Sequence, residues 1–332
     1  MAETSLAANV KPIAAGAHVT AAAFLEDVPV FALGDGTALR LDPEGEKRVA
    51  LHKDAAILVA TRAGTRLITG GDDGRVLAMD AAGSTEEILP AGGEWIDALV
   101  GRDDASIAWS SGREVSARDP QGNVKHFAAP SSVRGLAYAP KGYRIAIAHY
   151  NGATLWFPNA AAPPEVFAWK GAHLDVLFSP DGRFLITSMQ ENTLHGWRLA
   201  DKRDMRMSGY PAKTRSFSWS GDGHWLATSG AEACIVWSFK EKDGPMKKPP
   251  RECGARRVKV SRVAFHPKAL VIAIGYEDGW ILLCRLTDGA EVLVRQPQIE
   301  AHDPVSALVW DHDGRRLLFG TSEGNAGVLA MP

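Results

Sequence analysis

The sequence predicts an all-β protein, a closed β-propeller of eight four-stranded blades, with seven blades as the alternative. The first observation is a turn position that recurs eight times, at Gly36, Gly74, Gly112, Gly152, Asn192, Glu232, Gly279 and Gly324. Its spacings are 38, 38, 40, 40, 40, 47 and 45 residues, and a period of about 40 residues built from strands is typical of propellers. The second observation is strand-like alternation along the units, and the third is the lack of a convincing long helix.

The repeats follow one another within one domain that covers residues 1–332, because a closed repeat array is one cooperative object whatever its length. We expect a closing strand at 9–14 and units at about 18–52, 53–92, 93–130, 131–171, 172–212, 213–257, 258–300 and 301–332. Should one unit be absorbed elsewhere in the fold, seven blades would result.

The strands of a unit differ in pattern. First strands alternate apolar and polar residues, as in 133–138 and 261–265, which is typical of a strand with one buried face. Second strands are apolar throughout, as in 145–148 and 271–274, which indicates burial on both faces between neighbouring blades. Tight turns such as 179–182 join them, because Pro presets φ and Gly accepts a positive φ.

The two ends of the chain predict how the array closes. After the turn at Gly324 the chain has room for one more strand only, so the last unit lacks its fourth strand. The segment 9–14 leads into Gly16-Ala17-His18, and the same tripeptide recurs at 171–173 after a fourth strand. We therefore expect 9–14 to complete the last blade and close the ring. Pro12 fits only an outermost strand, because it cannot donate to a partner on both sides.

Bulk properties narrow the class of protein. The chain has 332 residues, 45% of them hydrophobic, a net charge of −2 and a pI of about 6.6, so no global field favours a polyanion. The longest apolar run, 269–275, is too short to span a bilayer, and the start lacks the features of a secretion signal. Cys234, Cys253 and Cys284 are unclustered in the sequence, which predicts no disulfide framework or zinc ribbon and favours a reducing cytoplasm.

In its repeated strands and turns the chain resembles the tryptophan–aspartate (WD) repeat family of β-propellers, over essentially its whole length. In that family a His before the first strand, a Ser/Thr on the second, an Asp in the next turn and a Trp on the third form a hydrogen-bonded tetrad in each blade. The matching positions are His52, Thr69 and Asp73; His173, Thr187, Glu191 and Trp197; His18 and Asp35; Thr228 and Trp237; Asp278; and His302 and Glu323. No unit holds a complete tetrad, so the resemblance implies a divergent member with structural histidines.

No catalytic constellation is found, so we expect a protein that is not an enzyme and has no cofactor. The phosphate-loop pattern fails at 209–214, which lacks the glycine before its lysine, and the remaining histidines have no metal-ligand spacing. The interpretation favoured by the resemblance is an interaction scaffold whose rim turns engage a protein partner, as a cytoplasmic monomeric propeller within a complex. An enzyme or a metal or small-molecule binder with a central-channel site is the alternative, because a ring can gather residues distant in sequence.

Two features exceed what the repeat needs. The stretch 240–262 holds nine basic residues against three acidic ones, which indicates a solvated loop, a docking site for an acidic partner, or a polyanion site. Aromatic residues also gather at two turns on the rim. The candidate partner-binding residues are His149, Tyr150, Tyr276, Glu277, Trp280, Lys247, Lys248, Arg251, Arg256 and Arg257. Membrane and nucleic-acid partners are not expected.

Overall fold

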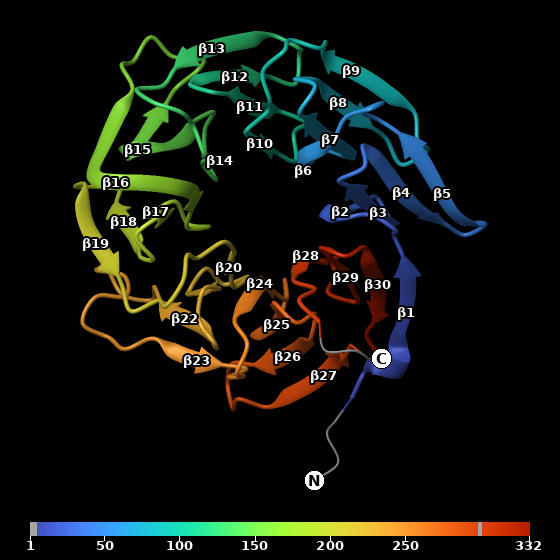
Figure 1. The fold of residues 1–332 in the computed structure, drawn as a ribbon. Coiled ribbons are helices and arrows are strands. Elements are labelled where there is room, and N and C mark those ends of the chain that lie inside the picture. The colour runs from blue at the N-terminus through green and yellow to red at the C-terminus, as the bar shows by residue number, and fades with distance from the viewer. Residues whose placement is uncertain (1–4, 298–300) are drawn as a thin grey trace. The chain divides into compact units, whose positions relative to one another are not determined.

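The computed structural model describes residues 5–297 and 301–332, and it consists almost entirely of strands (Figure 1). The strands gather in two compact parts. The middle part comprises residues 23–205, and the terminal part comprises the described residues up to 22 together with those from 206 onward. Among the described residues, no helix has the length and apolar character that crossing a membrane would require.

The middle part contains four sheets whose strands follow chain order. The first sheet holds β2 (Val19–Leu25, which straddles the boundary of the part), β3 (Val28–Leu33), β4 (Thr37–Asp42) and β5 (Gly45–Ala50). The second holds β6 (Ile57–Ala63), β7 (Arg66–Gly71), β8 (Val76–Met79) and β9 (Thr85–Leu89), and the third holds β10 (Ala98–Gly101), β11 (Ile107–Ser111), β12 (Glu114–Arg118) and β13 (Val124–Ala128). The fourth has six strands: β14 (Gly135–Tyr138), β15 (Ile145–Trp156), β16 (Glu165–Phe178), β17 (Phe184–Met189), β18 (Leu194–Arg198) and β19 (Arg203–Met207, which also straddles the boundary of the part).

The terminal part contains three four-stranded sheets. One holds β20 (Phe217–Trp219), β21 (Trp225–Thr228), β22 (Cys234–Ser238) and β23 (Arg251–Cys253), and the next holds β24 (Val260–Phe265), β25 (Val271–Tyr276), β26 (Ile281–Arg285) and β27 (Glu291–Arg295). The last has the order β28 (Val305–Trp310), β29 (Arg316–Thr321), β30 (Asn325–Ala330) and β1 (Val10–Ala14), and a short 3-10 helix, Ala7–Asn9, precedes β1.

The number of sheets corrects the main prediction. The described strands form seven separate sheets rather than eight, in agreement with the alternative of seven. The reason lies in the fourth and fifth predicted units, which share the six-stranded sheet. Strand β15 runs through the turn position at Gly152, and β16 runs through Gly171, where the boundary between the two units was expected. Both strands continue past these points with an irregular register, between Tyr150 and Gly152 and between His173 and Asp175.

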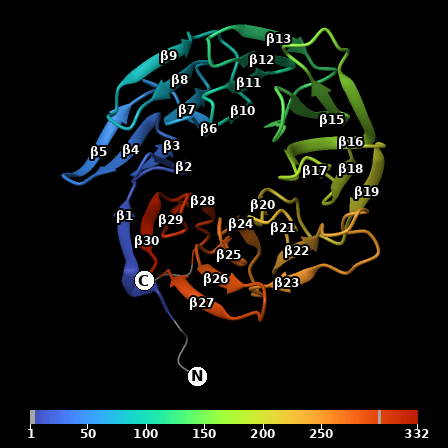
Figure 2. The same ribbon diagram turned by 180° about the vertical axis from the view of Figure 1, so that it is seen from behind.

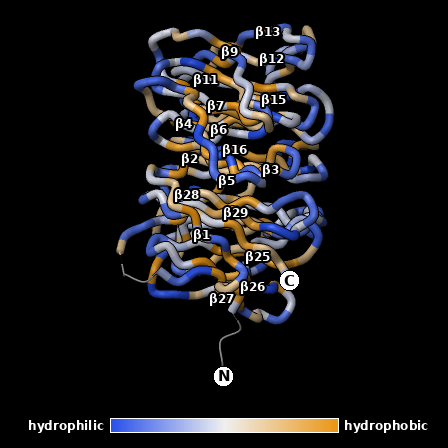
Figure 3. Tube along the Cα trace, turned by 90° about the vertical axis from the view of Figure 1, so that its right-hand side faces the viewer, coloured by the Kyte–Doolittle hydropathy of each residue, from blue (hydrophilic) through white to orange (hydrophobic). Residues whose placement is uncertain are grey.

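The core lies between neighbouring sheets of each part. In the terminal part, Ile272 and Ile274 of β25 pack toward β20–β23, whereas Ala273 between them packs toward β28–β30. Strands covered on both faces need apolar residues at successive positions, which explains the unbroken apolar runs of the second strands. Outer strands are different: β5 is almost entirely exposed and is drawn largely blue, that is hydrophilic, in Figure 3.

The N-terminal strand completes the last sheet, as predicted. Strand β1 pairs antiparallel with β30, with Val10 opposite Leu329 and Pro12 opposite Gly327, and Figures 1 and 2 show the two strands side by side from opposite directions. Strand β1 is the outermost of its sheet and Pro12 is exposed, so the missing N–H of the proline costs no ladder hydrogen bond.

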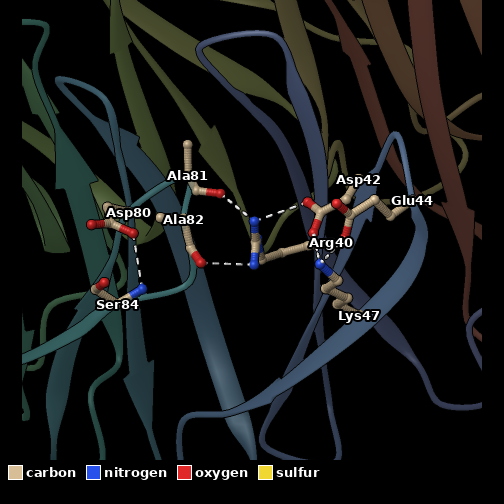
Figure 4. A network of polar contacts seen from close by, with 8 residues as sticks. All are labelled: Arg40, Asp42, Glu44, Lys47, Asp80, Ala81, Ala82 and Ser84. Atoms are coloured by element: carbon tan, nitrogen blue, oxygen red, sulfur yellow. Dashed lines mark hydrogen bonds and ion pairs between the residues drawn. The ribbon is translucent and has the colours of Figure 1, made fainter.

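A buried arginine joins two sheets of the middle part. Arg40 of β4 donates from Nη2 to Asp42 Oδ1 at 2.9 Å and from Nη1 to the carbonyl of Ala82 at 2.9 Å, and it also reaches the carbonyl of Ala81 (Figure 4). Residues 81 and 82 lie in the turn between β8 and β9. A planar guanidinium with several donors suits such a three-way contact better than an ammonium does.

Candidate functional site

The predicted histidine network is complete in one unit. His52 donates from Nδ1 to Asp73 Oδ1 at 3.0 Å, and its Nε2 accepts from the hydroxyl of Thr69 at 2.9 Å. His52 and Thr69 are buried. Gly71 makes room for the pair, because a Cβ at this position would lie 2.4 Å from His52 Nδ1 and 2.5 Å from Asp73 Oδ1. All polar atoms of the network are satisfied internally, so these residues serve the scaffold.

Two more histidines are buried, each with a Thr partner. His173 Nδ1 lies 2.7 Å from Thr187 Oγ1, and its Nε2 donates to the carbonyl of Trp169 at 3.0 Å. The predicted acidic partner Glu191 is exposed instead and accepts from the N–H of Ala172. The ring of Trp197 lies 5.8 Å from that of His173, so this unit keeps the His–Thr–Trp grouping without its acid.

The position of His149 differs from the prediction made from the sequence. It was predicted to bind a partner, but it is buried, donates from Nδ1 to the carbonyl of Tyr150 and lies 2.9 Å from Thr154 Oγ1. Burial lowers the pKa of His149, and it lowers the pKa of His173 as well. Both rings are therefore held neutral near pH 7.

In two other units, residues that were not predicted from the sequence make the hydrogen bonds expected of the tetrad histidine. Tyr210 is buried, and its hydroxyl joins Thr228 Oγ1 at 2.7 Å and Trp237 Nε1 at 2.6 Å, so a tyrosine stands where the histidine was absent. In the last unit, buried Asp303 accepts from the N–H of Glu323 and from Asn325 Nδ2. Its neighbour His302, which was predicted to fill this role, is exposed.

Three further predicted tetrad positions have different surroundings. His18 is exposed. Asp35 caps its own turn by accepting from the N–H and hydroxyl of Thr37. Asp278 accepts from the N–H of Trp280 and pairs with Arg256 at 3.0 Å. Sequence position alone therefore located the turn acids but not their partners.

Two exposed aromatic side chains mark one face of the middle part. Trp95 is 63% exposed and Tyr150 is 55% exposed. Trp95 lies in the connection from β9 to β10, which joins one unit to the next, and Tyr150 lies at the bend within β15. In an up-and-down meander, the connection into the first strand and the turn between the second and third strands lie at the same end of the strands. Both residues therefore lie on the same side of the sheets.

Polar contacts lie beside both aromatic positions and between them. Glu94 Oε2 accepts from the hydroxyl of Ser111 at 3.3 Å, and the N–H of Tyr150 donates to Ser131 Oγ at 2.9 Å. Between them, Arg134 lies 3.6 Å from Asp97. We call these residues the aromatic face: Glu94, Trp95, Asp97, Ser111, Ser131, Arg134 and Tyr150. Trp95 is not among the predicted partner-binding residues, although a Trp in the Gly-rich loop 91–95 is a signal that the sequence offers.

Comparison with known proteins gives local matches in sequence. The family model of the anaphase-promoting complex subunit 4 WD40 domain matches residues 263–331. WD repeat-containing protein 1-B of Xenopus laevis is 34% identical over 83 residues, which is 24% of this chain and 14% of that protein. The match therefore spans about one seventh of that relative, and its activity and partners say nothing directly about this chain.

Comparison of structures covers nearly the whole chain. The C-terminal WD40 domain of Sif2 matches with a TM-score of 0.77 and 13% identity, covering 97% of this chain and 98% of that one. The chain therefore has a β-propeller fold like that of the Sif2 domain. The computationally designed Ika8 protein is similarly close, with a TM-score of 0.78, 15% identity, and coverage of 95% and 97%. At these identities the likeness concerns the fold alone.

The basic stretch of the propeller is partly engaged in its own part. Arg251 places its guanidinium 4.7 Å from the centre of the Trp225 ring and donates to the carbonyl of Leu286. Arg256 lies 3.8 Å from the centre of the Trp280 ring, in addition to its pair with Asp278. Lys248 pairs with Glu241 at 3.1 Å, so several of the predicted docking cations hold the loop itself.

The other predicted partner-binding residues of the propeller divide by exposure. Lys247 and Arg257 are exposed, and Glu277 and Trp280 are half-buried. Tyr276 is fully buried, and its hydroxyl donates to the carbonyl of Gly254, so its prediction as a partner contact is wrong. Within residues 5–297 and 301–332, no three His, Cys, Asp or Glu side chains are placed to share a metal ion.

Proposed function

We propose that this propeller is a non-enzymatic interaction scaffold and that the aromatic face binds a protein partner. The observation that carries the proposal is the pair of exposed aromatic side chains, Trp95 and Tyr150, on one side of the middle part. Trp and Tyr are the residue types most enriched among binding hot spots, together with Arg. WD-repeat propellers as a class serve protein interaction, which supports the same conclusion.

The polar residues around the aromatic pair support a specific binding site rather than a nonspecific hydrophobic patch. Arg134 supplies a cation, Glu94 supplies a carboxylate, and Asp97 is fixed by the N–H of Gly112 at 2.8 Å. Polar groups around an aromatic centre match the usual arrangement of a partner interface, with an apolar core and a polar rim. No specific observation favours an enzyme or ligand binder with a central-channel site, or polyanion binding through the basic stretch 240–262. The proposal includes a cytoplasmic location.

The test compares capture by four forms of the tagged full chain from native lysate: wild type, Trp95→Ala, Tyr150→Ala and Val166→Ala. Val166 is the matched control, because it is 54% exposed but lies in β16 away from these turns. A hot-spot truncation costs about 2 kcal/mol of binding or more, which is about a thirtyfold loss of affinity. We expect the same proteins to be retained by wild type and Val166→Ala and lost from both aromatic variants.

Thermal unfolding of each variant checks that the fold is kept, as expected for exposed positions. Equal recovery of every protein by the aromatic variants and wild type would rule out the aromatic face as the site. Loss with Val166→Ala alone would move the interface to the outer strands.

A further inference from the structure

The three cysteines, unclustered in the sequence, come together in the terminal part. Cys234 of β22 is directly opposite Cys253 of β23 in the antiparallel register. Residues directly opposite on paired strands project to the same face with Cβ atoms about 5 Å apart. The thiols of Cys253 and Cys284 lie close enough for a hydrogen bond between them to shift the pKa of each. Cys284 belongs to β26 of the next sheet, and all three residues share one apolar cluster between the two sheets.

The three thiols are not equivalent in their environment. The hydrogen bond from Cys284, helped by the nearby Arg251, lowers the pKa of Cys253. The same hydrogen bond together with burial raises the pKa of Cys284, and burial raises that of Cys234. Because the thiolate is the reactive form of cysteine, Cys253 is the nucleophile of the cluster.

The position of Cys253 also makes it the thiol that solvent reaches first. Cys253 is 7% exposed, whereas Cys284 is 1% and Cys234 is 0% exposed. It ends β23, a three-residue outer strand whose other members, Arg251 and Glu252, are exposed. A short edge strand with few ladder hydrogen bonds opens locally more readily than the interior strands β22 and β26 do.

We propose that Cys253 and Cys284 form a reversible disulfide when the protein meets a peroxide, and that this bond ties β23 of one sheet to β26 of the next. In the first step the Cys253 thiolate attacks one oxygen of hydrogen peroxide. The O–O bond breaks, hydroxide leaves, and Cys253 becomes a sulfenic acid. In the second step the Cys284 sulfur attacks the Cys253 sulfur, the S–O bond breaks, and the Cys284 proton leaves with the oxygen as water. Two thiols and one peroxide thus yield one disulfide and two waters.

Each cysteine falls in a different tryptic peptide, which makes the test direct. Cys234 lies in 216–240, Cys253 in 252–256 and Cys284 in 269–285. The full chain is treated with hydrogen peroxide, alkylated, digested without reductant and examined by mass spectrometry. We expect peptide 252–256 linked to peptide 269–285, two hydrogen masses below the sum of the pair, and loss of this species after dithiothreitol. The oxidised protein should also melt several degrees higher, because the bond constrains the unfolded chain.

Two variants distinguish the assigned pair from the other arrangement. Cys234→Ser is expected to keep the 253–284 link, and Cys284→Ser to abolish it and leave a sulfenic acid on Cys253 that dimedone traps. A link between 216–240 and 252–256 in the wild type would assign the bond to the cross-strand pair and overturn the proposal. Recovery of all three peptides fully alkylated after peroxide would overturn it as well, and neither result depends on the folding of a variant.

Discussion

Both ring nitrogens of His52 are hydrogen-bonded within the protein, one to Asp73 and one to Thr69. A buried donor or acceptor that loses its partner costs more free energy than the bond itself contributes. Removal of one of the three residues leaves its partners unpaired, so substitution of His52 tests the structural role of the tetrad.

His52→Ala is expected to lower the free energy of unfolding by about 1–3 kcal/mol, because Thr69 and Asp73 are left without a partner. Denaturant unfolding measures the change, and capture of partners by the folded variant should be unchanged. His312→Ala is the control, since its side chain is 96% exposed and its removal should leave stability as it was. Equal stability of His52→Ala and wild type would refute the structural assignment.

His149 and His173 give the protein a dependence on acid. Burial lowers the pKa of each below the ordinary value of 6.5, so the unfolded chain takes up protons first as pH falls. Their contribution to stability is complete above pH 6.5 and is lost as pH decreases toward the folded pKa. We expect the melting temperature to fall between pH 7 and pH 5, and to fall less steeply in His173→Gln than in the wild type.

The control for the acid effect is His312→Gln, which should keep the wild-type slope because this ring is exposed in the folded protein. A melting temperature of the wild type that stays constant over the same pH range would contradict the burial of neutral histidines. The measurement needs only thermal scans of the three proteins in a series of buffers.

At the scale of residues, the sequence located the structural histidines where spacing was regular. His52, Thr69 and Asp73 were predicted and are bonded as expected. Tyr210 and Asp303 were missed, because a tyrosine can replace an imidazole only when its hydroxyl reaches the same threonine, and this depends on three-dimensional placement. Exposure is equally invisible in a pattern: Tyr276 and Tyr150 occupy similar turns, yet one is buried and the other is not.

At the scale of elements, β1 is held by its neighbours rather than by its own sequence. It pairs with β30, Ile13 is buried in the sheet, and Leu6 just before it donates its N–H to the carbonyl of Leu293 at 2.7 Å. Removing it would bare the polar edge of β30, and unpaired strand edges promote aggregation.

A chain that begins at residue 15 is expected to lose at least about 2–5 kcal/mol of stability, the usual effect of deleting one buried Ile side chain. A synthetic peptide of residues 5–14 should restore the melting temperature when added to this truncated chain. The same peptide with Ile13→Asp should not, because it places a charge at a buried position. A truncated chain that melts like the full chain would show that β1 is dispensable.

Among the strands, some pairings could be predicted from the sequence and others could not. The closing strand could be predicted because it depended on counting strands and on Pro12, both of which are sequence properties. The joining of two units in one six-stranded sheet could not. Whether β16 breaks at Gly171 or continues through it depends on hydrogen bonds to β15 and β17 on either side, and glycine permits both outcomes.

At the scale of the whole molecule, charge decides between the remaining interpretations of the basic stretch. The protein carries a net charge of −2, and Arg251, Arg256 and Lys248 already have partners. Of the five cations predicted to dock a partner, this leaves Lys247 and Arg257, which are exposed. Two cations on a slightly acidic protein give weak attraction for a phosphate backbone, since each neutralised phosphate contributes a slope of about −0.9 to the dependence of log K on log salt.

We therefore expect the protein to bind single- or double-stranded nucleic acid only at low salt, with a slope no steeper than about −2. Fluorescence anisotropy with a labelled duplex across a salt series measures it. Lys247→Glu combined with Arg257→Glu should remove even this binding, while capture of protein partners through the aromatic face persists because neither cation belongs to that face. A slope of about −4 or steeper would require at least four phosphate contacts. The engaged arginines would then have to release Asp278 and Trp225, and the basic stretch would be a polyanion site after all.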